Sequence, residues 1–103
     1  MNRALRGWYL LSGSVPASRV RAAGTLALQP RRVSRWNVFE FQDGGTHRMG
    51  LWPGKRWLGF CTCPEFRRAA LRPRPDGSVT PCRHLVWLRR HLDEDEAATA
   101  GAS

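Results

Sequence analysis

The sequence predicts a small α+β protein, in which a three-stranded antiparallel meander precedes a short helix and a C-terminal helix. Strand-like runs separated by glycine-containing turns occupy residues 33–63. Leu85, Leu88 and Leu92 recur at the spacing of one helical stripe near the end of the chain. At 103 residues, the chain allows one small domain with a small core.

The meander is predicted from three runs rich in aromatic residues. The run "RWNVFEF" (35–41) carries large side chains at alternating positions and is expected to be a strand buried on both faces. Asp-Gly-Gly at 43–45 is a hairpin signal, because glycine accepts the positive φ of such turns. "THRMGLW" (46–52) is the returning strand. Pro-Gly at 53–54 is a second turn, and "KRWLGFCTC" (55–63) is the third strand.

Two helices follow the strands. Pro64 is suited to the first turn of a helix, and "PEFRRAALRP" (64–73) is expected to form one. "RPRPDGSVTP" (72–81) is a loop, since three prolines and an Asp-Gly pair interrupt it. "PCRHLVWLRRHL" (81–92) is the amphipathic C-terminal helix. Its stripe opposite the leucines holds Arg83, Trp87 and Arg90.

The composition divides the chain into three parts. Residues 1–32 hold Gly, Ala, Ser, Pro and Arg with little periodicity, and we expect a loosely structured N-terminal arm there. Residues 33–92 form the organised domain. Residues 93–103 begin with four consecutive acids and end in small residues, and we expect a disordered tail.

The charge of the chain is strongly positive and unevenly distributed. The formal net charge is +9. Residues 1–92 carry all 17 basic residues and four acids, a balance of +13, and residues 93–96 carry the other four acids. A basic body favours an anionic partner, most commonly nucleic acid. An arginine-rich composition alone can also produce this excess, since 16 of the 17 basic residues are arginine.

The short apolar runs and the number of cysteines favour a protein of the reducing cytoplasm. No run approaches the roughly 20 apolar residues of a membrane-spanning helix, and residues 8–11 are shorter than the ~7–15-residue core of a signal peptide. Three cysteines would leave one thiol over in a disulfide framework, so a reducing compartment is the simpler assumption. We expect a cytoplasmic protein that is no enzyme and takes no small-molecule substrate. Neither a carboxylate pair, a phosphate-binding loop nor a Ser/His/Asp arrangement appears.

Four residues form a candidate metal site in two pairs. Cys61 and Cys63 form C-x-C at the end of the third strand, and Cys82 and His84 form C-x-H after an 18-residue spacer. Residues i and i+2 of an extended chain point to the same side, so each pair can aim both donors at one point. Three thiolates and one imidazole complete a tetrahedral zinc site, and four protein ligands leave no open position. We therefore predict one structural zinc ion bound by Cys61, Cys63, Cys82 and His84.

Other interpretations of these residues fit less well. Cys61 and Cys63 lack the C-x-x-C spacing and the βαβ context of a redox pair. Cys82 beside His84 lacks a third group that would orient a catalytic base, and the chain lacks the H-x-E and C-x-x-C elements of zinc deaminases. If the cysteines were simply buried and bound no metal ion, their arrangement as one C-x-C and one C-x-H pair would be a coincidence. His91 is an alternative ligand on the same helix, but we expect it on the surface because the set is already complete.

The ligand pattern resembles the SWIM zinc finger. "CTCPEF" (61–66) and "CRHL" (82–85) fit its C-x-C, variable spacer, C-x-H pattern, and the preceding strands fit its ββα arrangement. The resemblance covers roughly residues 33–92. It implies a zinc-binding module used for DNA binding or protein–protein contact, as in chromatin-remodelling ATPases, Mu-type transposases and recombination mediators. Here the module stands almost alone, so the enzymatic activities of the larger members do not carry over.

Two function classes follow for the surface. In the first, the chain binds nucleic acid, DNA in particular, through arginines, because the planar guanidinium binds phosphate bidentately. Trp87 then stacks on an exposed base; alternatively it packs against the N-terminal arm. The candidate residues are Arg67, Arg68, Arg72, Arg74, Arg83, Trp87, Arg89 and Arg90. In the second class, the chain is an adaptor that docks onto a recombination, helicase or transposition protein through exposed aromatics and residues 93–96.

Overall fold

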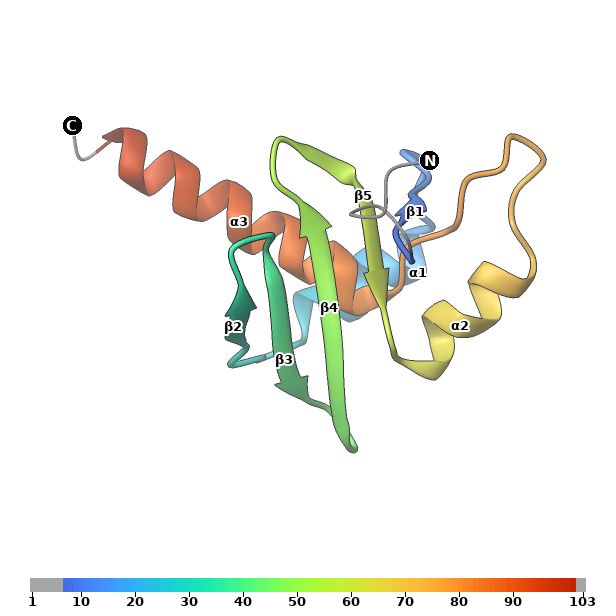
Figure 1. The fold of residues 1–103 in the computed structure, drawn as a ribbon, viewed down its shortest axis with the longest axis horizontal. Coiled ribbons are helices and arrows are strands. Elements are labelled where there is room, and N and C mark those ends of the chain that lie inside the picture. Colours follow the sequence, from blue (N-terminus) through green and yellow to red (C-terminus); the bar gives the residue numbers. More distant parts are fainter. Residues whose placement is uncertain (1–6, 102–103) are drawn as a thin grey trace.

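Residues 7–101 fold into a five-stranded antiparallel sheet and three helices, the α+β class that the sequence predicts (Figure 1). The computed structural model describes residues 7–101, and the side chains of residues 7–97. The strand order is β1-β5-β4-β3-β2. The radius of gyration is 13.5 Å, close to the ~13 Å of a folded 100-residue domain. The chain is therefore compact.

The predicted meander is confirmed, but residues 35–37, which the sequence predicts to begin its first strand, form a turn instead. The meander consists of β3 (Val38–Gln42), β4 (Thr46–Trp52) and β5 (Lys55–Cys61), which are antiparallel neighbours in the sheet. The two turns use glycine as expected, because Gly44 has a φ of 69° and Gly54 a φ of 81°. These are left-handed conformations that other residues adopt at a cost.

The prediction that β3 is buried on both faces is wrong. Phe39 and Phe41 are buried in the core, whereas Val38 and Glu40 on the other face are only half-buried. The reason is visible in Figure 1, where α1 and α3 both lie behind the sheet. The helices of the described residues thus cover one face of the meander and leave the other open.

The predicted N-terminal arm contributes regular structure to the fold. In its described part, β1 (Tyr9–Leu10) pairs with β5, and α1 (Ala17–Gly24) packs against the C-terminal helix. β2 (Arg31–Ser34) begins in the arm and pairs with β3. Leu11, just after β1, is buried in the core. Residues 1–6 of the predicted arm lie outside the described residues.

The two predicted helices are present. α2 (Pro64–Leu71) has the predicted proline in its first turn and buries Phe66. α3 (Arg83–Gly101) packs on β4 and β5. Its stripe of Leu85, Leu88 and Leu92 is buried as the spacing predicts. Among the described residues, no helix combines the length and apolar character needed to cross a membrane.

The structure differs from the expected disordered tail, because α3 continues from residue 92 to Gly101. Arg56 of β5 forms ion pairs with Asp93 and Glu96, which hold the acidic turn of the helix beside the sheet. These partners are 37 and 40 positions apart in the sequence, so local composition does not reveal the contact. Residues 102–103 of the predicted tail lie outside the described residues.

Candidate metal centre

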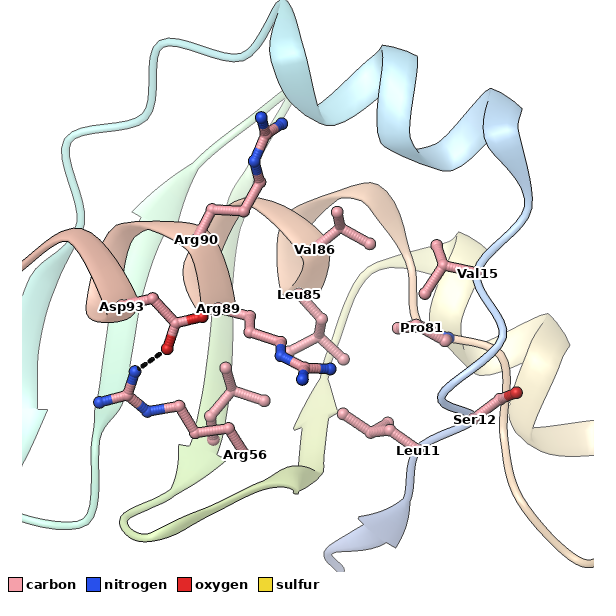
Figure 2. Close-up of a pocket in the computed structure, with 11 residues that line it drawn as sticks. Leu11, Ser12, Val15, Arg56, Pro81, Leu85, Val86, Arg89, Arg90 and Asp93 are labelled. Carbon is pink, nitrogen blue, oxygen red and sulfur yellow. Dashed lines mark hydrogen bonds and ion pairs between the residues drawn. The ribbon is translucent and has the colours of Figure 1, made fainter.

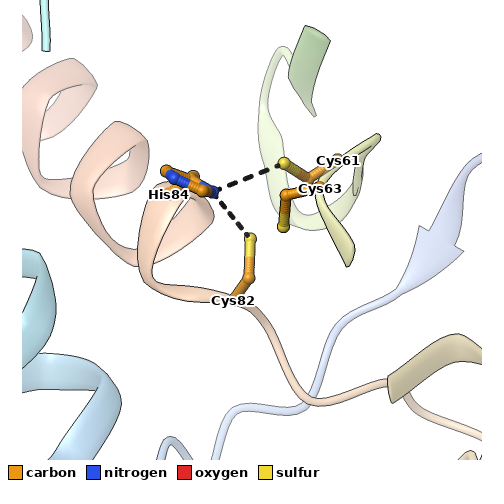
Figure 3. Close-up of side chains that lie close together, drawn as sticks. All are labelled: Cys61, Cys63, Cys82 and His84. Atoms are coloured by element: carbon orange, nitrogen blue, oxygen red, sulfur yellow. Dashed lines mark hydrogen bonds between the residues drawn. The ribbon is translucent and has the colours of Figure 1, made fainter. Parts of the chain in front are cut away.

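The four predicted ligands lie together where β5, α2 and α3 meet (Figure 3). Cys61 is the last residue of β5, Cys63 is the N-cap of α2, and Cys82 and His84 flank the first residue of α3. All four side chains are buried, and their sulfur and nitrogen atoms all lie within 4.8 Å of one another. The grouping expected from the sequence is therefore present.

The spacing of the donor atoms fits one four-coordinate metal ion. Nδ1 of His84 lies 3.8 Å from Sγ of Cys61 and 3.8 Å from Sγ of Cys82. Ligand atoms about 2.0–2.3 Å from a tetrahedral zinc ion would lie roughly 3.5–3.8 Å from one another. The cluster can thus hold a metal ion with protein ligands alone.

Asp43, in the turn between β3 and β4, contacts the histidine of the cluster from the other side. The Nε2–H of His84 donates to Oδ2 of Asp43 at 2.6 Å, which leaves Nδ1 facing the sulfurs. This hydrogen bond holds the pKa of Asp43 below its usual range. A carboxylate placed in this way sets the tautomer of a metal-binding imidazole and makes it a stronger ligand. From the sequence, Asp43 is assigned only to a turn.

Cys63 and Cys82 differ in how readily their thiols lose a proton. Hydrogen bonds with Cys61 and Cys82, and one from the backbone N–H of Phe66, hold the pKa of Cys63 far below its usual range. Burial instead raises the pKa of the Cys82 thiol, and its sulfur neighbours add to that rise. A bound cation would offset this cost, because metal ions bind the thiolate form.

The imidazole of His84 is also shifted. Burial lowers its pKa, but hydrogen bonds with Cys61, Cys63 and Asp43 outweigh burial and raise the pKa to about 10. Without a metal ion, the imidazole would therefore be positively charged at neutral pH, with a second proton on Nδ1. A bound metal ion would take the place of that proton at Nδ1.

Glu65 joins three helices beside the metal centre. Its Oε1 accepts a hydrogen bond from the backbone N–H of Arg83 at 3.0 Å, at the start of α3. The same oxygen lies 2.6 Å from Nη1 of Arg19 on α1. Glu65 itself belongs to the first turn of α2, so one carboxylate links α1, α2 and α3. Sequence reasoning does not single out this residue.

The arginines predicted to contact nucleic acid are distributed over several places. Arg68 and Arg83 line a pocket next to the metal centre, and Arg83 lies 3.7 Å from Asp43. Arg89 and Arg90 line a cavity of about 120 Å³ between α3 and the segment after β1, and Figure 2 shows Arg89 pointing into it. The remaining three are exposed on α2 and in the loop that follows: Arg67, Arg72 and Arg74.

Trp87 lies on the side of α3 that faces α1. It is half-buried and lines a hollow with Gly24 and Leu26, and Arg90 lines the same hollow. Its ring stacks on His91, with ring centroids 4.9 Å apart and planes at 11°. Trp87 thus packs beside the described part of the N-terminal arm, and the His91 ring stacks on it, outside the metal cluster.

Comparison of the chain with protein-family models, with curated proteins and with solved structures found no match. The fold and the cluster together define a small α+β protein with a candidate metal centre of three cysteines and one histidine. The resemblance to the SWIM finger stays a prediction, supported by the spacing of the four ligands and by their convergence.

Proposed function

We propose that this chain is a DNA-binding module held together by one structural zinc ion. The buried cluster of three cysteines and one histidine carries the proposal. Thiolate and imidazole ligands in a tetrahedral arrangement suit zinc, whereas hard cations such as Mg²⁺ prefer oxygen. Because protein atoms fill all four positions, such an ion would support the fold and leave no position for a substrate.

The energy of such a site is large compared with the stability of a small domain. Structural zinc sites in small peptides contribute about 10–16 kcal/mol near neutral pH. A typical domain is stable by only ~5–15 kcal/mol in total. The ligands come from the end of β5, the start of α2 and the start of α3. Zinc would therefore fix these three elements to one another.

The positive surface supports an anionic partner. Several arginines are already neutralised by carboxylates, such as Arg19 by Glu65 and Arg56 by Asp93. Others are exposed and take part in no ion pair within residues 7–97: Arg67, Arg68, Arg72, Arg74, Arg89 and Arg90. DNA phosphates are the commonest ligand of such a surface, and their neutralisation makes binding strongly dependent on salt.

The test is a titration of labelled DNA with the zinc-loaded protein at several salt concentrations. We expect the logarithm of the affinity to fall linearly with the logarithm of the salt concentration. The double variant Arg67→Ala/Arg68→Ala should weaken binding and reduce that slope by about one for each phosphate that the protein no longer neutralises. Arg21→Ala, which removes an exposed arginine on α1, serves as the control. If the protein binds neither single-stranded nor double-stranded DNA at low salt, the proposal is refuted.

A second candidate function is that of a protein adaptor. The cavity in Figure 2 favours it, because Leu11, Leu85 and Val86 form an apolar lining that a partner side chain could fill. A pull-down with the intact protein, with and without nuclease treatment, separates the two functions. A partner that remains after nuclease treatment supports the adaptor, and one that disappears on treatment supports nucleic-acid binding.

A further inference from the structure

Four aromatic side chains form a connected cluster on the sheet. The rings of Trp36 and Trp52 are stacked, with centroids 4.9 Å apart and planes at 18°. Trp8 meets Trp52 edge to face at 5.6 Å and meets Phe60 edge to face at 4.9 Å. We name these four residues the open-face cluster. Within the described residues, none of the four is a fully buried core residue, although Phe60 also packs against the core.

Gly50 shows which face of the sheet the cluster occupies. Its neighbours Met49 and Leu51 are fully buried against the helices, so position 50 points to the opposite face. A Cβ at Gly50 would lie 2.7 Å from Cε1 of Phe60 and 2.9 Å from Cη2 of Trp8. The rings therefore lie directly on the backbone of β4, on the face that α1 and α3 leave open in Figure 1.

The cluster is partly accessible and carries a cation at its margin. Trp36, in the turn before β3, is 40% exposed. The guanidinium of Arg35 lies over its ring, 5.2 Å from the centroid. Aromatic and guanidinium planes are the two groups on which proteins stack unpaired bases. A base can stack on the Arg35 plane or take its place over Trp36.

Further positive charge lies on the same face. Glu40 of β3 contacts Arg31 at 3.3 Å and Arg48 at 3.6 Å, so two arginines share one carboxylate. Their side chains are 75% and 59% exposed. Arg48 is two positions along β4 from Gly50, which places its Cα about 7 Å away. The face thus combines stacking surface with an excess of positive charge at the distance scale of a nucleotide.

We propose that this open face binds single-stranded DNA, with bases stacked at Trp36 and phosphates contacted by Arg31 and Arg48. The inference rests on the proposed function, DNA binding, and assigns a surface and a strand state to it. The bases of a duplex are already stacked on one another, and its grooves admit a helix or a two-stranded ribbon. A broad sheet face with exposed indole can stack only on unpaired bases.

The charge and the polar groups of this face favour DNA over the other occupants. A protein partner would have to bring acidic groups against the two arginines. RNA is told from DNA at its 2′-hydroxyl, and the neutral pair on this face, Gln42 and Thr46, hydrogen-bond to each other at 2.8 Å. What the described face presents is stacking surface and cations, the combination found in proteins that bind single strands without reading sequence.

The experiment measures binding of the zinc-loaded full chain to fluorescein-labelled oligo(dT), to a duplex of the same length and to oligo(U), by anisotropy. We expect tighter binding to oligo(dT) than to either of the others, with quenching of tryptophan fluorescence. Trp36→Ala should weaken oligo(dT) binding roughly 5- to 150-fold, the range measured for loss of one stacking aromatic. Trp57→Ala is the matched control, because Trp57 is 47% exposed and makes no aromatic contact within the described residues.

A second variant guards against loss of folding. Arg35→Glu leaves every ring of the cluster in place and should weaken oligo(dT) binding while circular dichroism and zinc content stay unchanged. If both variants bind as tightly as the parent while Arg67→Ala/Arg68→Ala binds DNA more weakly, the open-face inference is wrong and the proposed function stands. If the parent protein binds no nucleic acid, the open-face inference and the proposed function are both wrong. Preference for duplex or for oligo(U) would overturn the assignment to single-stranded DNA.

Discussion

Nε2 of His84 lies 2.6 Å from Oδ2 of Asp43, so a turn of the sheet holds the histidine of the candidate metal centre. Removing the charge should weaken the site without removing any ligand. We expect Asp43→Asn to lower zinc affinity about 10- to 100-fold, the usual effect of losing such a partner. Competition with a chromophoric chelator measures the affinity.

The control for this variant is Asp76→Asn. Asp76 is a loop aspartate whose side chain accepts hydrogen bonds only from its neighbour Ser78 within the described residues. The zinc affinity of this control should equal that of the parent. Equal affinities for Asp43→Asn and the parent would show that the turn does not tune the metal centre.

Removal of zinc should unfold the protein. The ligands lie at the ends of three elements, and the zinc contribution of about 10–16 kcal/mol is comparable with the whole stability of a small domain. We expect excess chelator to abolish the helical circular dichroism signal and one equivalent of zinc to restore it. Chelator already saturated with zinc is the control. A spectrum that excess chelator leaves unchanged would rule out a zinc-dependent fold.

Stability should fall as the pH falls from about 8 to 5. The zinc-bound protein needs three thiolates and a neutral imidazole, whereas the unfolded chain takes up protons on cysteine below about pH 8.5 and on histidine below about pH 6.5. Because the unfolded state then binds more protons, stability rises with pH, by about 1.4 kcal/mol per pH unit for each proton. In the folded protein without a metal ion, the pKa of His84 is about 10, so the imidazole holds its second proton more firmly than a histidine of the unfolded chain does.

Thermal melts from pH 5 to 8 in zinc-containing buffer, with a dye that reports released zinc, measure this dependence. His91→Gln is the control, because His91 stacks on Trp87 outside the metal cluster. Its pH profile should coincide with that of the parent. A melting temperature independent of pH across this range would contradict a thiolate-bound metal.

Local patterns predict the centre of the molecule well. Glycines at the two hairpin turns and the alternation of large side chains define β3, β4 and β5, since both signals act over a few residues. The ligand set is predictable because each pair is two positions apart at the end of an element. Convergence of the two pairs needs only that α3 returns to β5.

Contacts between distant residues are not predictable in the same way. β1 is two residues long and exists through its pairing with β5. Arg56 reaches across 37 positions to Asp93, and Asp43 across 41 to His84. Each of these side chains is an ordinary polar residue in its own neighbourhood. Only the three-dimensional arrangement gives it a partner, so periodicity and composition carry no signal of the contact.

Glu65 should matter more for stability than its position on a short surface helix suggests. It accepts a hydrogen bond from the first backbone N–H of α3 and pairs with Arg19 on α1. An unsatisfied helix N-terminus costs about 0.5–2 kcal/mol. We expect Glu65→Ala to destabilise the zinc-bound protein by about 1–2 kcal/mol, which lowers the melting temperature by roughly 4–8 °C per kcal/mol for a domain of this size.

Two further variants make the Glu65 experiment specific. Glu65→Gln keeps an oxygen that can accept from Arg83 and loses only the charge, so it should fall between Glu65→Ala and the parent. Glu40→Ala removes a carboxylate of similar exposure that pairs with two exposed arginines on the sheet. Exposed pairs contribute about 0–1 kcal/mol, so this change should be the mildest. If Glu40→Ala costs as much as Glu65→Ala, the link between the three helices does not contribute beyond a surface ion pair.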